Sequence, residues 1–302
     1  RPFPIPEEYD EAKLKAIQIP PNYPDHPLVR RDWYAYQRSV EVVDQHVGVI
    51  LDQLKEEGVL DNTIVMFFAD HGRPMPWGKQ WLSVEGLQVP LIMRGPGVAA
   101  GGAEERLVSL IDLAPSILQL AGLTVPPWME GRGILGREFP ERSRLFAARD
   151  RCGDAMDRIR AVIEPDALFV RNFQPSRSRL NWSGYKESSY PGMPLLRVLN
   201  EAGKLNEFQA QWLMPRREAL EYYDLKADPQ GLHNIAKDAK VVDRMAAMRS
   251  AMDKWINTSP DHGAQGDPPT EPPLSAIQRD KRHDYERIWK SRVKKAQPSD
   301  AE

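Results

Sequence analysis

The strongest constraint on the fold is a helical pattern that leads directly into a short run of apolar residues. In residues 34–58 the apolar side chains recur at helical spacing on one face, and Gly58 is suited to end the helix. The next segment, residues 62–70 (NTIVMFFAD), is apolar at consecutive positions. Such a strand is buried on both faces, which is typical of parallel sheets covered by helices. A layered α/β domain is therefore expected.

The same alternation continues after this strand. Residues 87–97 (LQVPLIMRGPG) predict a second short strand that ends in a Pro-Gly turn. Residues 109–122 (SLIDLAPSILQLAG) predict a helix with Pro115 in its first turn. Alternating helices and strands favour a mostly parallel sheet flanked by helices over residues 1–140. In such sheets, active groups are expected at the carboxyl ends of the strands.

The second half of the chain has a different pattern. Three strand-like runs lie between residues 143 and 173, with a hairpin turn between the last two. Residues 241–255 then repeat apolar side chains at helical spacing. We expect a small antiparallel sheet with a covering helix over residues 141–258, followed by a charged, proline-containing peripheral tail over residues 259–302.

The composition excludes several classes of protein. The 302 residues carry a formal net charge of −2, whereas a nucleic-acid-binding surface would show as a basic excess. The apolar run from Ile64 to Ala69 is far shorter than the ~20 residues that cross a bilayer, so no membrane span is expected. Cys152 is the one cysteine of the sequence, which excludes an intrachain disulfide and a cysteine metal cluster.

The apolar strand stops at Asp70, His71 and Gly72, so that an acid and an imidazole stand side by side. Carboxylate oxygen and imidazole nitrogen are ligands that divalent cations accept. Neighbouring side chains on a strand point to opposite faces, so both can reach one ion only where the strand ends. Gly72 permits that break, and Pro74 and Pro76 prevent the strand from continuing. The alternative is a polar strand end, in which Asp70 accepts turn amides and His71 is only solvated.

The segment from Gly72 to Lys79 (GRPMPWGK) can be compared with a nucleotide-binding loop. Five residues separate its glycines where that pattern has four, and a glutamine follows the lysine in place of Ser or Thr. Two prolines also remove backbone amides that such a loop points at phosphate. A nucleotide-phosphate loop is therefore excluded.

The continuation of this segment, residues 77–97 (WGKQWLSVEGLQVPLIMRGPG), resembles the arylsulfatase-like enzymes of the alkaline phosphatase superfamily. Residues 38–72 resemble the helix and strand that lead to the family's metal site, and residues 107–122 resemble the helix that follows it. Residues 221–236 (EYYDLKADPQGLHNIA) are similar to the family's closing signature, and residues 149–162 resemble the heparan N-sulfatase-like subgroup. The resemblance implies a sulfatase-like α/β fold.

This resemblance also implies a set of roles. Asp70 and His71 would ligate a divalent cation, most often Ca²⁺ in this family, although many members have Asn where this chain has His71. Lys79 would bind a sulfate oxygen and neutralise charge as the S–O bond of an ester or the S–N bond of a sulfamate breaks. The substrate would be a sulfated sugar or an aryl sulfate. By the same resemblance, the protein would be exported to the periplasm, the extracellular space or the lysosome.

The family's nucleophile is a formylglycine, made from the first residue of a Cys/Ser-x-Pro/Ala-x-Arg motif. Cys152 lies in the sequence CGDAM, without an arginine at the required position, so no residue of this chain can be that nucleophile. The chain also begins without a methionine, and its first residues, from Arg1 to Phe3, resemble the segment after a family histidine. We interpret the chain as the C-terminal portion of a sulfatase and expect it to be inactive alone.

Three charged residues, Arg149, Asp150 and Arg151, end a predicted strand. They are candidates to contact an anionic sugar, and the alternative is a surface ion-pair cluster. Two other functions remain open. One is a phosphodiesterase or phosphonate hydrolase of the same superfamily, which has plain Thr where a sulfatase has Cys or Ser as the nucleophile. The other is a catalytically silent binding protein.

Overall fold

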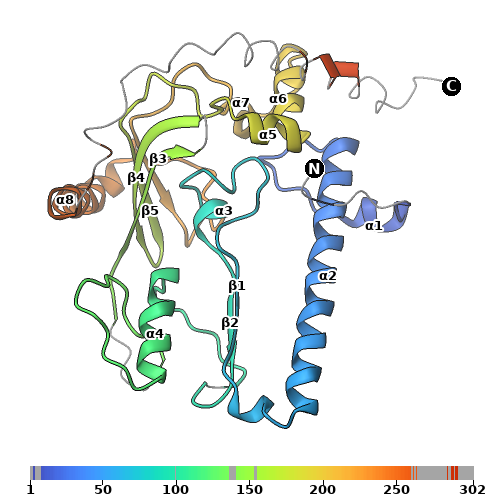
Figure 1. Ribbon diagram of the computed structural model, residues 1–302. Helices are drawn as coiled ribbons and strands as arrows, with labels where there is room; N and C mark the ends of the chain where they lie inside the picture. The colour runs from blue at the N-terminus through green and yellow to red at the C-terminus, as the bar shows by residue number, and fades with distance from the viewer. Residues whose placement is uncertain are drawn as a thin grey trace.

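The structure is a computed structural model, and it describes most of the chain. The described residues are 3, 8–98, 100–135, 141–152, 155–259, 261, 263, 284, 287, 288, 290 and 291. Figure 1 shows the long helix α2 beside a two-stranded pair, and a second sheet with the helix α8 against it. The predicted boundary near residue 140 and most of the predicted tail lie outside the described residues.

The described chain contains helices of very different lengths. The helices are α1 (Glu11–Ala16), α2 (Pro27–Glu56), α3 (Val84–Leu87), α4 (Leu113–Leu120), α5 (Gly184–Ser189), α6 (Gly192–Glu201), α7 (Glu207–Ala210) and α8 (Val242–Thr258), and the 3-10 turns are η1 (Leu60–Asn62), η2 (Leu110–Asp112) and η3 (Ala239–Val241). No helix among these residues is long and apolar enough to cross a membrane.

α2 is the longest helix, and much of its apolar stripe is open. It begins at Pro27, where Nδ1 of the His26 imidazole accepts a hydrogen bond of 3.2 Å from a backbone N–H two residues further on. In its second half, Val43 and Ile50 are 44% and 55% exposed. The helix predicted in residues 34–58 is therefore present, but it starts earlier and its apolar side chains are not all covered.

β1 (Val65–Phe68) and β2 (Leu91–Arg94) form an antiparallel pair. The prediction of a mostly parallel sheet is therefore wrong for these strands. A parallel pair needs a crossover that returns the chain to the start of the sheet. Residues 69–90 instead leave and re-enter at the same end of the pair, where the Ala69 N–H donates to the Pro90 carbonyl at 3.3 Å. We call these residues the 69–90 loop.

The second sheet has the strand order β3-β4-β5-β6, and each neighbouring pair is antiparallel. Its strands are β3 (Leu145–Cys152), β4 (Ala155–Glu164), β5 (Ala167–Asn172) and β6 (Leu220–Asp224). One face packs on α8, where Val162 and Phe169 meet Met248. The other face carries an apolar cluster that includes Ile159, and Leu82 of the 69–90 loop packs against this cluster. The predicted small antiparallel sheet with a covering helix is confirmed.

An aromatic core surrounds the 69–90 loop and joins the two parts of the chain. The ring of Trp77 lies between Tyr23 and Trp212, with ring centroids 4.6 and 4.7 Å apart. Trp81 packs on Trp212 with a centroid distance of 5.1 Å. These rings are buried, so the loop is part of the core and is not a mobile surface turn.

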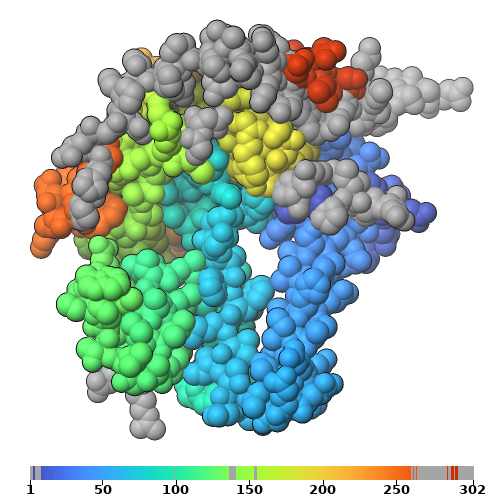
Figure 2. All heavy atoms as spheres, viewed as in Figure 1, coloured from blue at the N-terminus to red at the C-terminus, as the bar shows by residue number. Residues whose placement is uncertain are grey.

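Figure 2 shows that the α2 side of the molecule is hollowed. An open space separates much of α2 from the β1–β2 pair. Phe68 on β1 and Ile92 on β2 are 47% and 63% exposed. Apolar side chains that the sequence predicted to be buried on both faces of a sheet are therefore in part uncovered.

Candidate active site

Asp70 and His71 meet directly after β1. The Asp70 Oδ2 and His71 Nε2 atoms are 3.3 Å apart, and His71 Nδ1 lies 2.9 Å from the Gly72 carbonyl oxygen. A carbonyl oxygen only accepts, so Nδ1 is the donor in this bond, and Nε2 is the nitrogen whose lone pair a metal ion can bind when the ring is neutral. The Asp70 carboxylate and the Nε2 lone pair of His71 can therefore bind one cation together. Oxygen and nitrogen ligands suit a divalent ion.

These two ligands are only part of a metal site. Ca²⁺ usually takes six to eight oxygen ligands at about 2.3–2.6 Å. Within the described residues, no group of three or more His, Cys, Asp or Glu side chains is arranged to hold an ion. The Asp70 side chain is 81% exposed, so its carboxylate is open to further ligands. The pair fits one side of a divalent site that these residues do not complete.

The 69–90 loop folds tightly behind this pair. The Gly72 N–H donates to the Gly86 carbonyl at 3.2 Å. A Cβ atom on Gly72 would overlap the Glu85 carbonyl oxygen, so only glycine permits this approach. The Glu85 carboxylate accepts hydrogen bonds from Asn22 Nδ2 at 2.9 Å and from Tyr23 OH at 2.8 Å. These bonds fasten the loop to the segment that precedes α2.

Lys79 lies on a strained part of this loop. Trp77 and Gln80 have φ angles of 72° and 89°, and this left-handed region costs a non-glycine residue about 1–3 kcal/mol. Two hydrogen bonds hold the strained backbone, from the Lys79 N–H to the Arg73 carbonyl at 2.7 Å and from Ser83 Oγ to the Trp77 carbonyl. Backbone strain concentrates where a fixed geometry is needed, which supports a positioned role for Lys79.

The Lys79 side chain is half-buried against an aromatic ring. Its Nζ lies 5.3 Å from the ring centroid of Tyr185 in α5. A cation over an aromatic face is stabilised by about 0.5–1 kcal/mol at exposed sites, so the ring restricts where the amine can go. That Lys79 shares one site with Asp70 and His71 stays a prediction.

Lys186, which sequence reasoning missed, supports the same loop from inside the core. This α5 residue is fully buried. Its Nζ donates to the Pro74 and Met75 carbonyls at 2.6 and 2.7 Å. Burial, with a smaller effect from the charge of Lys79, lowers the pKa of Lys186 to about 6. No local signal distinguishes this lysine in the sequence, because the carbonyls that it binds lie 112 and 111 positions away.

The lowered pKa of Lys186 predicts a pH-dependent stability. The unfolded chain holds this proton up to a pKa of about 10.4, whereas the folded chain releases it at about 6. The unfolded state therefore binds more protons between these values, and the free energy of unfolding rises from about pH 7 to about pH 9. Urea unfolding at both pH values is expected to show this rise, and Lys186→Met should remove most of it. Equal rises in the two proteins would contradict the prediction.

The three candidate residues at the end of β3 are not brought to one site. Asp150 pairs with the buried Arg160, whose Nη1 and Nη2 donate to the carboxylate at 2.9 and 3.0 Å. Arg149 is 6% exposed and lies 5.5 Å from the Trp81 ring centroid. Its three guanidinium nitrogens have no hydrogen-bond partner in the part of the chain that the structure describes. Arg151 is exposed. Asp150 thus matches the ion-pair alternative.

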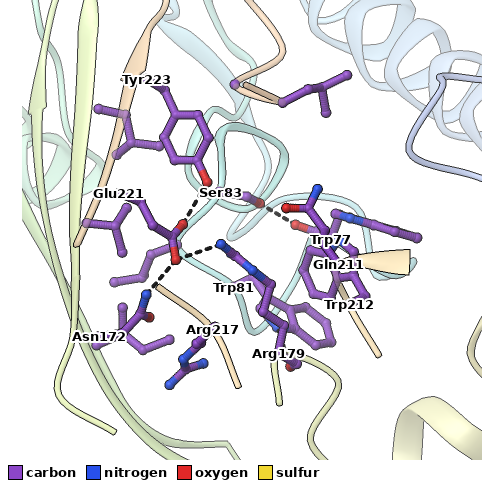
Figure 3. A pocket seen from close by; sticks show the side chains of 16 residues that line it. Trp77, Trp81, Ser83, Asn172, Arg179, Gln211, Trp212, Arg217, Glu221 and Tyr223 are labelled. Carbon is purple, nitrogen blue, oxygen red and sulfur yellow. Dashed lines mark hydrogen bonds and ion pairs between the residues drawn. The ribbon is translucent and has the colours of Figure 1, made fainter. Parts of the chain in front are cut away.

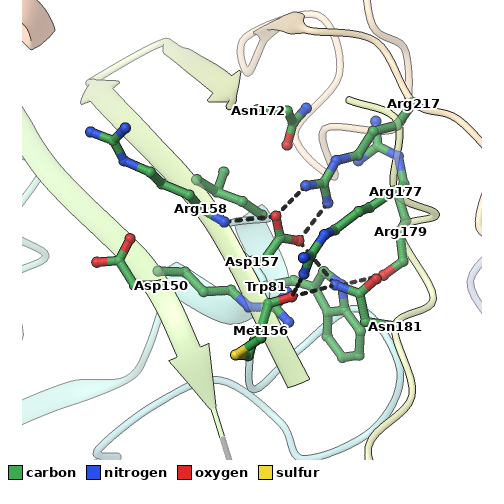
Figure 4. A network of polar contacts seen from close by, with 12 residues as sticks. Trp81, Asp150, Met156, Asp157, Arg158, Asn172, Arg177, Arg179, Asn181 and Arg217 are labelled. Carbon is green, nitrogen blue, oxygen red and sulfur yellow. Dashed lines mark hydrogen bonds and ion pairs between the residues drawn. The ribbon is translucent and has the colours of Figure 1, made fainter. Parts of the chain in front are cut away.

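A buried polar network lies beside these residues (Figure 4). Asp157 of β4 accepts from both Nη atoms of Arg217, one of them at 2.7 Å, and from Asn181 Nδ2 at 3.1 Å. Arg177 donates to the Met156 carbonyl at 2.8 Å. The network fastens the irregular segment after β5 to the sheet. It is a structural clamp, since its buried carboxylate is already paired.

Figure 3 shows a small cavity between the second sheet and the aromatic core. Glu221 in its wall pairs with Arg179 at 2.7 Å, and accepts hydrogen bonds from Asn172 Nδ2 and from Tyr223 OH, the latter at 2.6 Å. The cavity volume of about 50 Å³ is enough for a few water molecules. It is too small for a sugar ring, so this cavity is not a substrate pocket.

Comparison with known proteins identifies relatives for most of the chain. Residues 6–123 match the family model described as Sulfatase. An ulvan-active sulfatase of Formosa agariphila is 35% identical over 247 residues, which cover 81% of this chain and 41% of that protein. Human N-sulphoglucosamine sulphohydrolase is 26% identical over 278 residues, which cover 83% of this chain and 52% of that protein. The chain therefore spans about half the length of the curated relatives that it matches.

Solved structures share the fold. A 2-O GAG sulfatase superposes with a TM-score of 0.59 at 21% identity, over 88% of this chain and 56% of that one. The phosphonate monoester hydrolase of Silicibacter pomeroyi superposes with a TM-score of 0.55 at 20% identity, over 78% of this chain and 43% of that one. At these identities the likeness concerns the fold alone. Together, the family model and the relatives show that residues 6–123 carry a sulfatase-family domain and that most of the chain is similar to sulfatases.

Proposed function

We propose that this chain is the C-terminal portion of a sulfatase that hydrolyses a sulfate ester or sulfamate of a sulfated carbohydrate. The observation that carries the proposal is the meeting of Asp70 and His71 at 3.3 Å, directly before the strained loop of Lys79. The names of the two curated relatives, which refer to ulvan and to N-sulphoglucosamine, support a sulfated-sugar substrate. This chain has no Cys/Ser-x-Pro/Ala-x-Arg motif, so the proposed nucleophile belongs to a part of the enzyme outside it.

In the proposed enzyme, Asp70 and His71 hold a divalent cation, for which Ca²⁺ is the expected ion. When bound, the cation supplies positive charge beside a sulfate oxygen. His71 can offer Nε2 as a ligand because its Nδ1 is held by the Gly72 carbonyl, which orients the ring. Lys79 adds a second positive charge in a fixed position. Negative charge grows as the S–O or S–N bond breaks, so this lysine stabilises the transition state more than the substrate.

Arg149 and Arg151 are proposed contacts for anionic groups of the sugar. The buried Arg149 guanidinium supports this role, because no described group accepts a hydrogen bond from its nitrogens and an anionic group of the sugar could accept one. Asp150 is the weaker candidate of the three, since Arg160 already binds its carboxylate.

The uncovered apolar surfaces support a wider sheet in the proposed enzyme. The β1–β2 pair would be continued by further, mostly parallel strands from a part of a sulfatase that this chain does not contain. The open space beside α2 in Figure 2 is where such strands would fit. Exposed apolar side chains on both sides, such as Ile50 on α2 and Ile92 on β2, favour an apolar layer between them.

The proposal can be tested by expressing this chain together with the coding sequence that precedes Arg1. The longer polypeptide is expected to hydrolyse a chromogenic aryl sulfate or an N-sulfated glucosamine. The isolated chain is expected to show no turnover, because it lacks the nucleophile motif. Turnover by the isolated chain would overturn the assignment. A phosphonate monoester in the same assay tests the related hydrolase function, which the shared fold keeps as an alternative.

The isolated chain is expected to bind Ca²⁺ only weakly. Ca²⁺ usually takes six to eight oxygen ligands. Asp70 offers carboxylate oxygen, His71 offers nitrogen, and the described residues add no third acidic or imidazole ligand to the pair. Calorimetric titration should give a weak signal that Asp70→Ala removes. Tight stoichiometric binding by the isolated chain would contradict the expectation.

A further inference from the structure

The amine of Lys186 is matched to two carbonyl groups of the 69–90 loop. Its Nζ donates to the Pro74 carbonyl at 2.6 Å and to the Met75 carbonyl at 2.7 Å. The same atom lies 4.8 Å from the ring centroid of Trp81 and 5.5 Å from that of Tyr190. The whole side chain is buried, so loss of the amine removes a donor that water cannot easily replace. The Met75 carbonyl would keep one hydrogen bond, from the Gly78 N–H at 3.3 Å, whereas the Pro74 carbonyl would lose the donor described for it.

The electrostatic surroundings favour an uncharged amine at this position. Lys79 and Arg149 oppose a positive charge on Lys186, whereas Cys152 and Glu85 favour it. Burial is the largest influence, and the pKa of about 6 leaves the amine mostly neutral at pH 7. A neutral amine keeps two N–H donors, which equals the number of carbonyls that face it. It also adds no repulsion to the neighbouring charge of Lys79.

We propose that Lys186 is a positioning residue for Lys79. It holds the Pro74–Met75 turn in place by two hydrogen bonds, and that turn leads into the strained backbone on which Lys79 is carried. A catalytic importance of Lys186 rests on the proposed function. Its effect on the position of the loop does not. We do not propose Lys186 as a catalytic residue, since its side chain is buried and its amine binds two carbonyls of the loop.

Hydrogen exchange of the isolated chain tests the proposal without any need for activity. Lys186→Met keeps the length of the side chain and removes its donors. The Lys79 amide, which donates to the Arg73 carbonyl, is expected to exchange at least tenfold faster in this variant, while amides of β4 and β5 keep their rates. Lys237→Met is the matched control, because the Lys237 side chain is 83% exposed and pairs with the surface residue Glu218.

A rescue experiment separates the hydrogen bonds from mere filling of space. Lys186→Ala leaves room for propylamine, which restores the two donors, whereas 1-propanol fills a similar volume with one donor. Propylamine is expected to restore slow exchange of the Lys79 amide, and 1-propanol to restore much less. Unchanged exchange in Lys186→Met, equal acceleration throughout the second sheet, or equal rescue by the two compounds would each overturn the proposal. If the loop loosens as expected but the longer polypeptide hydrolyses no sulfate ester, only the proposed function fails.

Discussion

Replacing Lys79 with alanine is expected to lower kcat for sulfate hydrolysis by about 10²–10³ in a polypeptide that supplies the nucleophile, because a fixed donor to charge that grows in the transition state is lost. KM should change much less, since the lysine contributes less to binding of the ground state. Steady-state kinetics with an aryl sulfate and an N-sulfated glucosamine measure both constants.

Two variants make this result specific to Lys79. Lys79→Arg keeps the charge but replaces a compact ammonium with a planar guanidinium, so it should recover only part of the rate. Lys237→Ala removes an exposed lysine of the second sheet region and should leave kcat unchanged. A parent enzyme that is indifferent to Lys79→Ala would refute the role of this residue and, with it, the assignment of the loop.

Breaking the buried ion pair between Asp157 and Arg217 is expected to destabilise the fold by about 3–5 kcal/mol. The two side chains are 0% and 2% exposed, so Arg217→Met leaves a carboxylate in the core without its main partner. Asn181, which donates to the same carboxylate at 3.1 Å, cannot neutralise its charge. The measurement is the free energy of urea unfolding of the isolated chain.

The control for this prediction is an exposed pair in the same half of the chain. Lys237 and Glu218 form an ion pair at 2.7 Å with side chains 83% and 53% exposed. Such surface pairs contribute about 0–1 kcal/mol, so Lys237→Met should change the free energy of unfolding by less than about 1 kcal/mol. If both variants had the same small effect, the network in Figure 4 would not be the clamp inferred from its burial.

The second half of the chain followed its sequence pattern more closely than the first. Strand-like runs separated by turn residues, and a helix with methionines at helical spacing, were enough to predict β3 to β6 and α8, because the partners of these elements lie within the chain. The run from Val65 to Phe68 was correctly predicted as a strand, but its parallel pairing was not. That error arises because consecutive apolar residues indicate that both faces of a strand are buried, but they do not indicate in which direction the neighbouring strand runs.

The candidate site shows the same division. Asp70, His71 and Lys79 could be chosen from the sequence, because a strand that stops at an acid and an imidazole is visible in a short stretch of residues. Lys186 and the burial of Arg149 against Trp81 could not be chosen, because each depends on neighbours that are distant in the chain. The pairing of Asp150 with Arg160 could not be chosen either, since the partner of a charged residue is set by the strand beside it.

The sequence by itself determined the class of fold, the strand that ends in an acid–imidazole pair, the absence of a sulfatase nucleophile motif and the antiparallel sheet under its helix. These features depend on local periodicity and on residue types at fixed spacing. Only the tertiary structure decided the antiparallel β1–β2 pairing, the strained backbone on either side of Lys79, the buried amine of Lys186 and the uncovered side of α2. The physical reason is that direction of pairing, burial and charge pairing are properties of contacts between distant segments, and no single stretch of sequence contains them.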